Sequence, residues 1–261
     1  VDAAGPTFPV ELADTLRSIV ESNLRAVAAP GFTVTVSSPS LGVWEHAVGL
    51  SRLSPPTAMA PGDRLRVGSI TKSFNAAVAI QLEHEGVWSL DQPADNWVSG
   101  LGLGSDVTLR RLLDHTAGLF NYTDDPLFLT QPPTRPSDVV AWALEHGRVH
   151  DPGRGWSYSN TGYFVTGLAI EAATGTSFAA AVRARLLDPL ELVDTATQPD
   201  ELALSIVDGH VNGRENTDIV DMSWAWAAGG MVSTTGDLCR WARALYAGDA
   251  LSPEVREAVL T

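Results

Sequence analysis

The alternation of apolar and polar residues predicts a helix followed by a β-hairpin at the start of the chain. Apolar residues recur at helical spacing from Pro9 to Ala29, which is typical of an amphipathic helix, and Pro30-Gly31 ends it. Two β-rich runs follow, FTVTVSS at 32–38 and GVWEHAVGLSR at 42–52, joined by a Ser/Pro/Gly turn.

The rest of the chain is mostly helical in pattern. A segment with helix-forming composition runs from Ile70 to Glu85 and stops at Gly86. Four helical patterns then alternate with Gly/Pro loops at 107–116, 136–147, 160–175 and 177–190. A short β-prone piece at 229–233 precedes a last helix at 236–247. We therefore divide the chain into an N-terminal helix and hairpin at 1–68, a mainly helical region at 69–220 and an incomplete return to the first part at 221–261.

The composition of the chain argues against several classes of function. The formal charge of −14 argues against a nucleic-acid partner, which needs a basic surface. No apolar run is long enough for a membrane span, and the first residues lack the pattern of a signal peptide. With one cysteine there is no internal disulfide and no cysteine-based metal cluster, and Cys239 fits a small buried hydrophobe better than a nucleophile.

The stretch RVGSITKSF contains Lys72, the only lysine among 17 basic residues. Ser69 lies three positions earlier, so both side chains share one face if a helix begins at or just after the serine. A serine hydroxyl needs a base to become a nucleophile, and a buried lysine can lose its proton whereas arginine cannot. In the simpler alternative, Ser69 only caps the helix and Lys72 is solvated.

A second candidate lies in GRGWSYSNTGYF, where Tyr158 and Asn160 flank Ser159 in a loop before a predicted helix. Residues two apart in an extended segment point the same way. A phenol near a lysine can move a proton, and an amide can bond both the lysine and a substrate carbonyl. Taken alone, the pair Ser159-Asn160 favours a helix cap with Tyr158 packed beneath it.

Together, these motifs resemble a known family. VGSITKSF, LLDHTAGLFNYTDD, GWSYSNTGYFVTGLAIE and SWAWAAGGMVSTTGDL occur in the order found in the serine penicillin-recognising hydrolases. These include class C β-lactamases, D-alanyl-D-alanine carboxypeptidases, esterases and D-aminopeptidases, and the secreted Streptomyces-type carboxypeptidases look most similar. The resemblance implies an α/β (α+β) fold of the β-lactamase/DD-peptidase type, with an antiparallel sheet flanked by helices and a mainly helical region.

The resemblance also implies roles for individual residues. Ser69 is the expected acylated nucleophile, Lys72 its activating partner, and Tyr158 a general base and proton relay. Asn160 is expected to orient the substrate and Trp224 to line the substrate pocket, although core packing explains a tryptophan equally well. His115, in the HTAGL block, is expected to be structural.

The resemblance implies a cell-wall peptide ending in D-Ala-D-Ala as the substrate, an extracytoplasmic site, sensitivity to β-lactams and no metal or organic cofactor. An esterase or β-lactamase on the same fold is the first alternative. A catalytically silent protein that binds a peptide or a β-lactam is the second.

One feature of the family is missing from the sequence. Its members carry a Lys or His followed by Thr-Gly on a strand near the C-terminus, and that strand supplies an oxyanion donor. This chain ends at LSPEVREAVLT without it. We expect a fragment of a longer protein, although a second chain could supply the strands, or the protein could be naturally short and impaired. Removing one oxyanion donor costs about a hundred- to a thousandfold in turnover.

Overall fold

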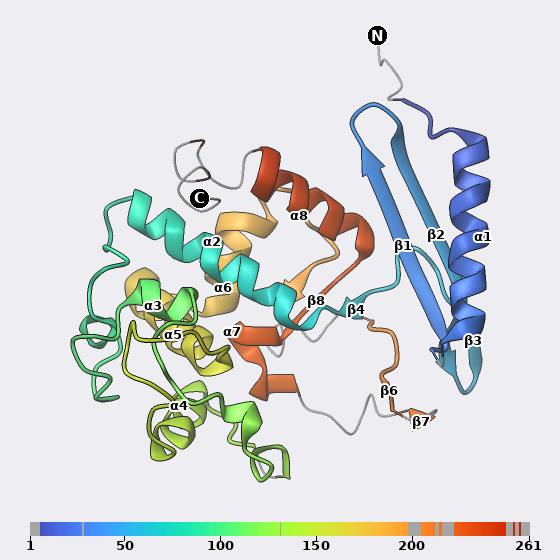
Figure 1. The fold of residues 1–261 in the computed structure, drawn as a ribbon. Helices are drawn as coiled ribbons and strands as arrows, with labels where there is room; N and C mark the ends of the chain where they lie inside the picture. Colours follow the sequence, from blue (N-terminus) through green and yellow to red (C-terminus); the bar gives the residue numbers. More distant parts are fainter. Residues whose placement is uncertain are drawn as a thin grey trace.

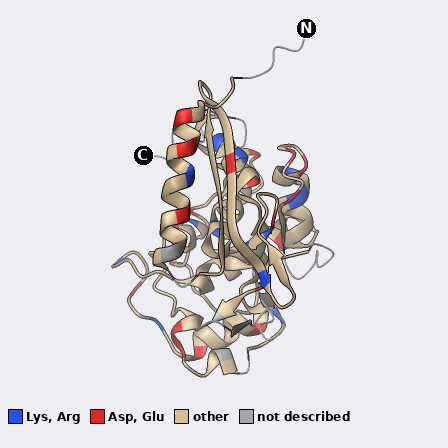
Figure 2. Cartoon of the chain, turned by 90° about the vertical axis from the view of Figure 1, so that its right-hand side faces the viewer, with Lys and Arg blue, Asp and Glu red and all other residues tan. Residues whose placement is uncertain are grey.

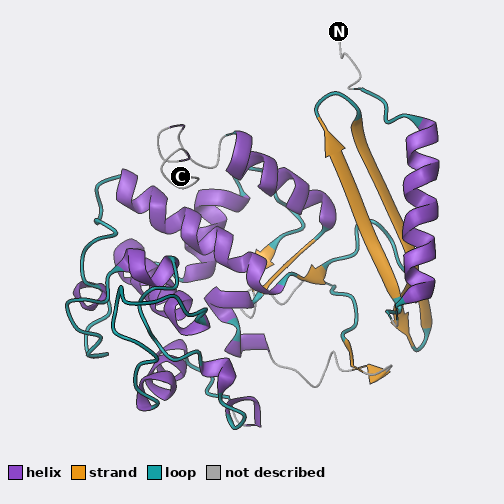
Figure 3. Ribbon diagram, in the orientation of Figure 1, coloured by secondary structure: helices purple, strands orange, loops and turns teal. Residues whose placement is uncertain are grey.

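The computed structural model of the chain begins with the predicted helix and hairpin (Figures 1 and 3). It describes residues 6–27, 29–130, 132–197, 205–211, 214–215 and 222–248, together with Pro253 and Arg256. Helix α1 spans Val10–Ala26, and the antiparallel strands β1, Gly31–Ser38, and β2, Gly42–Leu53, pair from Gly31↔Gly49 to Ser38↔Gly42. The hairpin turn ends at Gly42, whose φ of 86° lies in the left-handed region that glycine tolerates.

The hairpin is extended by a third strand that the sequence did not predict. Strand β3, Pro56–Ala58, pairs antiparallel with the end of β2, which gives the order β1-β2-β3. It is a three-residue edge strand that begins at a proline, so it carries no periodic signal. Helix α1 lies along this sheet, and acidic and basic residues are spaced along its length (Figure 2).

A second sheet joins distant parts of the chain. Strands β4, Leu65–Arg66, and β5, Ala196–Thr197, both pair with β8, Met231–Ser233, in the order β4-β8-β5. The predicted β-prone piece is thus shorter than expected, because its first residue belongs to helix α7, Trp226–Gly229. A small pair, β6 His210–Val211 with β7 Arg214–Glu215, stands apart from both sheets.

The remaining helices form one body in which each predicted helical pattern is represented. They are α2 Thr71–His84, α3 Leu109–Leu113, α4 Pro136–Glu145, α5 Asn160–Thr174, α6 Phe178–Val182 with the π-helical turn η5 Arg183–Leu187, and α8 Thr235–Ala247. Short 3₁₀ turns are η1 Gly68–Ile70, η2 Ala94–Asn96, η3 Tyr122–Asp124, η4 Phe128–Thr130 and η6 Met222–Trp224.

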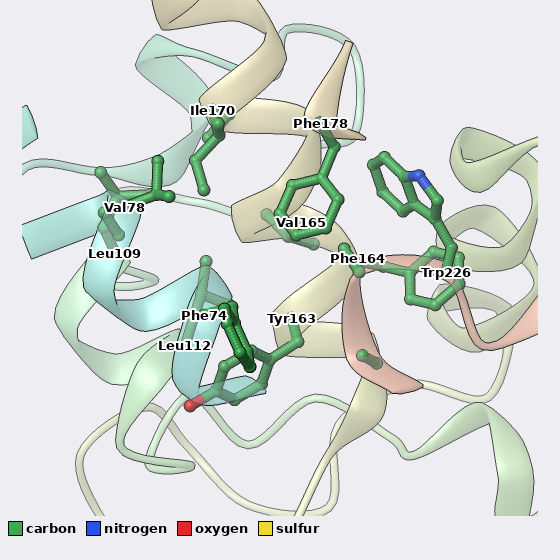
Figure 4. Close-up of a cluster of buried hydrophobic side chains, with 14 of the residues drawn as sticks. Phe74, Val78, Leu109, Leu112, Tyr163, Phe164, Val165, Ile170, Phe178 and Trp226 are labelled. Carbon is green, nitrogen blue, oxygen red and sulfur yellow. The ribbon is translucent and has the colours of Figure 1, made fainter. Parts of the chain in front are cut away.

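The hydrophobic core lies within this helical body (Figure 4). Helix α5 runs through its centre, and the ring of Phe164 packs against Trp226 with centroids 5.2 Å apart. Phe178 packs against the same indole at 5.5 Å, and Phe74 of α2 stacks on Trp241 of α8 at 4.1 Å. These contacts join α5 and α6 to α7, and α2 to α8.

The hairpin sheet meets the helical body through α8. The hydroxyls of Thr35 on β1 and Thr235 on α8 are 2.7 Å apart. The sulfur of Cys239 lies 3.6 Å from the Thr35 carbonyl oxygen, and burial raises the pKa of its thiol. A raised pKa keeps the thiol protonated, and a protonated thiol suits packing better than nucleophilic chemistry.

The predicted combination of an antiparallel sheet, flanking helices and a mainly helical region is confirmed (Figure 3). The proposed division of the chain into three parts stays a prediction. Within the described residues, no single helix has the length and apolar character to cross a membrane. Helix α5 and the segment formed by α6 and η5 have that length and apolar character only when taken together, and the two are bent by 76° relative to each other.

Candidate active site

Ser69 and Lys72 are brought together by a change of helix type at the start of α2. The turn η1 carries Ser69, and the α-helix begins two residues later at Thr71. Gly68 before it has φ 53°, a left-handed conformation that favours glycine. As a result, the Lys72 Nζ lies 3.2 Å from the Ser69 Oγ. The predicted shared face is confirmed, and Ser69 does not cap the helix.

Tyr158 completes a group of three polar atoms. Its hydroxyl oxygen is 2.7 Å from the Ser69 Oγ, and the Lys72 Nζ is 4.9 Å from the centroid of its ring. Ser69 is exposed and Tyr158 is 37% exposed, so a carbonyl group from solution can reach the serine. The alternative in which Tyr158 packs beneath a helix cap is therefore wrong.

Lys72 is buried, and its amine is hydrogen-bonded to two other residues besides Ser69. Its Nζ donates to the Asn160 Oδ1 and to the Ala228 carbonyl oxygen, each at 2.7 Å, while only 6% of the residue is exposed. Burial disfavours the charged form and lowers the pKa of the amine to about 8. The alternative of a solvated lysine is wrong, and near neutral pH this amine exchanges its proton readily.

The loop before α5 aims Tyr158 and Asn160 at the lysine. Ser159, between them, has the extended angles φ −141° and ψ 118°, so its neighbours point to the same side. Within the described part of the chain, the buried Ser159 hydroxyl makes no capping bond. The Ser159 side chain thus leaves the capping of α5 to other groups.

His115 supports this loop from behind. Its Nδ1 accepts a hydrogen bond from the Ser159 backbone N–H at 3.2 Å, and its ring centroid lies 4.6 Å from that of Tyr158. Its φ of 65° is unusual for a residue other than glycine. Burial and then the nearby Lys72 charge lower the pKa of the imidazole, which favours the neutral ring. These contacts suit the expected structural role.

Trp224 packs against the hydrophobic core. Its carbonyl oxygen accepts a hydrogen bond from the Tyr122 hydroxyl at 2.7 Å, and its ring meets Phe128 edge-on at 6.5 Å. These are packing contacts, as the alternative interpretation expects. A role of Trp224 in substrate binding stays a prediction.

The chain matches a known family model over most of its length. Residues 16–261 match the Beta-lactamase family. The chain belongs to that family. Its members are serine hydrolases that share this fold, penicillin-binding proteins and D-amino acid amidases among them.

Relatives of this Beta-lactamase family chain include enzymes and penicillin-binding proteins. "Penicillin-binding protein 4*" of Bacillus subtilis is 25% identical over 245 residues, which are 84% of this chain and 53% of that protein. The chain spans about half the length of the curated relatives it matches.

Two solved structures resemble the chain over nearly its whole length. A D-stereospecific amidohydrolase from Streptomyces sp. is 30% identical with a TM-score of 0.79, over 95% of this chain and 76% of that one. The D-amino acid amidase of Ochrobactrum anthropi SV3 is 27% identical with a TM-score of 0.84, over 94% and 72%.

Sequence reasoning missed parts of this Beta-lactamase family site. The Ala228 carbonyl that binds Lys72 is a backbone group, so no side-chain pattern reveals it. Asn121, whose Oδ1 accepts the Asn160 backbone N–H at 3.0 Å, lies 39 residues earlier in the chain. Its position directly after HTAGLF, within a block typical of the family, was the available signal.

A metal has no evident place at this site. Among the residues the structure describes, no group of three or more His, Cys, Asp or Glu side chains is arranged to hold an ion. The side chains that meet at Ser69 are a hydroxyl, an amine and a phenol, which together can carry out proton transfer and acyl transfer.

Proposed function

We propose that this chain is the acylating part of a serine hydrolase and that Ser69 is its nucleophile. The observation that carries the proposal is the position of the Ser69 Oγ between the Tyr158 hydroxyl, 2.7 Å away, and the buried Lys72 Nζ, 3.2 Å away. An exposed hydroxyl beside two groups able to take its proton is the arrangement that nucleophilic catalysis needs.

In the first step, the Ser69 oxygen bonds to the substrate carbonyl carbon while its proton passes to Lys72 or Tyr158. Collapse of the tetrahedral intermediate breaks the bond to the leaving amine, which takes up that proton, and an ester on Ser69 remains. Water then attacks the ester, and the serine is regenerated with release of a carboxylic acid. The same two groups serve both steps, with protons shared between them.

Two N–H groups of Lys72 are already directed at fixed acceptors. In the neutral amine, donation to the Asn160 Oδ1 and to the Ala228 carbonyl leaves the lone pair for the Ser69 hydroxyl. We therefore assign the first proton to Lys72. Tyr158 then shares the proton through its own contact with Ser69.

As the substrate we propose a peptide that ends in D-alanyl-D-alanine, which makes the protein a carboxypeptidase of the bacterial cell wall open to β-lactams. The sequence resemblance described above and the relative named as a penicillin-binding protein support this choice. Such a substrate also implies a site outside the cytoplasm, which is part of the proposal.

Hydrolysis of D-amino acid amides is the second candidate. The two solved structures described above carry the names of D-stereospecific amide hydrolases, and each covers more than nine-tenths of this chain. An amide and a D-alanyl peptide both present an acyl carbon next to a D-configured centre, so one acyl-enzyme scheme serves both.

The nucleophile is tested by intact-protein mass spectrometry after incubation with a fluorescent penicillin and with a fluorophosphonate. We expect one adduct on the wild-type chain and none on Ser69→Ala, which locates the adduct on the serine. Failure of both reagents to label the wild-type chain would favour a silent binding protein.

The substrate is tested by initial rates on a D-Ala-D-Ala peptide, its L-Ala-L-Ala counterpart, a D-amino acid amide, an ester and a cephalosporin. We expect the D-Ala-D-Ala peptide to be hydrolysed fastest and the L-peptide not at all. Faster turnover of the amide would select the second candidate.

A further inference from the structure

A small polar cluster lies directly behind Asn160. It consists of Asn121, Thr123 and Asp124, and we call it the Asn121 cluster. The Asn121 Nδ2 donates to the Thr123 Oγ1 and to the Asp124 Oδ1, each at 2.8 Å. Asn121 itself is 8% exposed, so its amide depends on these partners in place of water.

The cluster holds Asn160 at two points. The Asn121 Oδ1 accepts the Asn160 backbone N–H at 3.0 Å, and the Thr123 Oγ1 accepts the Asn160 side-chain Nδ2 at 3.2 Å. The Thr123 oxygen thus receives two amide donors, one from Asn121 and one from Asn160, which uses both of its lone pairs.

This arrangement decides which end of the Asn160 amide faces the lysine. With the Nδ2 on Thr123, the Oδ1 is turned to the Lys72 Nζ, 2.7 Å away. A rotated amide would put its NH₂ group against the Lys72 amine, donor against donor, and would remove one of the two donors from the Thr123 oxygen.

We propose that Thr123 and Asn121 are positioning residues of the acyl-transfer reaction, which hold the Asn160 amide with its oxygen on Lys72. Neither residue touches Ser69 in the described contacts, so both act through Asn160. The inference rests on the proposed function, because it assigns a role within that same site.

Two substitutions of Thr123 and one control substitution test whether the Thr123 hydroxyl positions Asn160. Thr123→Val is expected to slow acylation by a fluorescent penicillin about tenfold, because the hydrogen bonds that the Thr123 oxygen accepts from Asn121 and Asn160 are lost. Thr123→Ser keeps the hydroxyl and is expected to stay within about threefold of the wild type. The matched control is Thr166→Val, whose hydroxyl bonds only the Gly162 carbonyl inside α5 among the described contacts.

A double variant separates positioning from general damage. If Thr123 acts through Asn160, Thr123→Val is expected to cost nothing further in an Asn160→Ala background. Thermal unfolding of each variant reports its stability. Equal losses in Thr123→Val and Thr166→Val, or additive losses in the double variant, would overturn the proposal.

Lys72 offers a readout that needs no activity, because it is the only lysine in the chain. Labelling with ¹³C-lysine gives one side-chain NMR signal whose shift reports the pKa of this amine. The titratable groups around it are Tyr158, Tyr163 and His115. A loosened Asn160 oxygen stabilises the ammonium less, so Thr123→Val is expected to lower the pKa by roughly half a unit to one unit.

The two readouts also separate this inference from the proposed function. A wild-type chain that reacts with neither serine reagent would overturn the proposed function. A Lys72 pKa that is lower in Thr123→Val but not in Thr123→Ser would still show that the Thr123 hydroxyl positions Asn160. A Lys72 signal that titrates at the same pH in the wild type, Thr123→Val and Thr123→Ser would overturn the role.

Discussion

Helix α5 is buried along most of its length, whereas helix α1, of similar length, lies on the hairpin sheet with Val10 and Ile19 exposed. The difference extends to their surroundings. Among the described residues before Leu65, Trp44 and Met59 are the only buried hydrophobic ones, while the core cluster runs from Phe74 to Trp241. Figure 4 shows side chains from α2, such as Phe74, and from α5, such as Phe164, within this cluster.

This contrast explains where the chemistry lies. Lys72 is on α2 and Asn160 opens α5, so both hydrogen-bonding groups are fixed by the packed body. Catalytic groups need such support, because small displacements cost much of the rate. The hairpin sheet contributes none of the contacts described here at Ser69. Substitutions in the two regions should therefore differ in kind as well as in size.

The sharpest test exchanges one cation for another in each region. Lys72→Arg is expected to reduce acylation roughly a thousandfold, because a guanidinium stays protonated and cannot accept the Ser69 proton. Arg17→Lys on the exposed face of α1 is the matched control, expected to stay within about twofold of the wild type. Labelling rates with a fluorescent penicillin, which acylates serine, measure the effect in both variants. A Lys72→Arg variant of normal rate would show that no neutral amine is needed.

Truncation of a phenylalanine compares the two cores directly. Phe164→Ala on α5 removes a fully buried ring and is expected to lower the free energy of unfolding by about 3–5 kcal/mol. Phe32→Ala on β1 removes a half-buried ring and is expected to cost about 1–2 kcal/mol. Urea denaturation followed by tryptophan fluorescence measures both. Equal losses would mean that the hairpin is as tightly packed as the helical body.

The pH dependence of acylation tests what burial does to the amine. Burial lowers the Lys72 pKa to about 8, so the neutral base is lost as pH falls below that value. Acylation is expected to fall about tenfold per unit of pH below the midpoint and to level off above it. In the Arg17→Lys variant, the second lysine is expected to titrate near 10.4, the ordinary value, in the same NMR experiment. A rate that falls as pH rises through 8 would show that the protonated amine is required and would exclude neutral Lys72 as the base.

Local signals in the sequence predicted the local part of this structure. The helical periodicity of α1, α4, α5 and α8 and the alternation in β1 and β2 each lie within one segment. The spacing of Ser69 and Lys72 is likewise a property of one helix start. Strands β4 and β5 were missed, because two residues form a strand only when a distant partner, here β8, is already in place.

The site shows the same limit. Tyr158 and Asn160 could be placed on one side of a loop, but their contact with Lys72 depends on how α5 packs against α2. Family resemblance supplied that link, and periodicity did not. The Ala228 carbonyl and Thr123 were missed, since one is a backbone atom and the other a common residue whose importance lies only in its hydrogen bonds.

The last prediction concerns a glycine at the contact of α5 with α7. A methyl group on Gly167 would lie 2.6 Å from the Ala227 Cβ and 2.9 Å from the Trp226 ring, closer than carbon atoms pack. Gly167→Ala is therefore expected to cost about 1–3 kcal/mol, even though alanine favours helices. The displaced segment includes Ala228, whose carbonyl binds Lys72, so acylation should fall a few-fold as well.

Gly62→Ala is the control in the outer part of the chain, because a methyl group there meets no atom within 4 Å. Alanine restricts the unfolded chain, so stability should stay equal or rise by up to about 1 kcal/mol, with normal acylation. Thermal unfolding measures the stability of both variants, and labelling rates measure their acylation. If Gly167→Ala loses stability but acylates normally, α7 can shift without moving the lysine, and the packed body is a less rigid support for the site than its burial indicates.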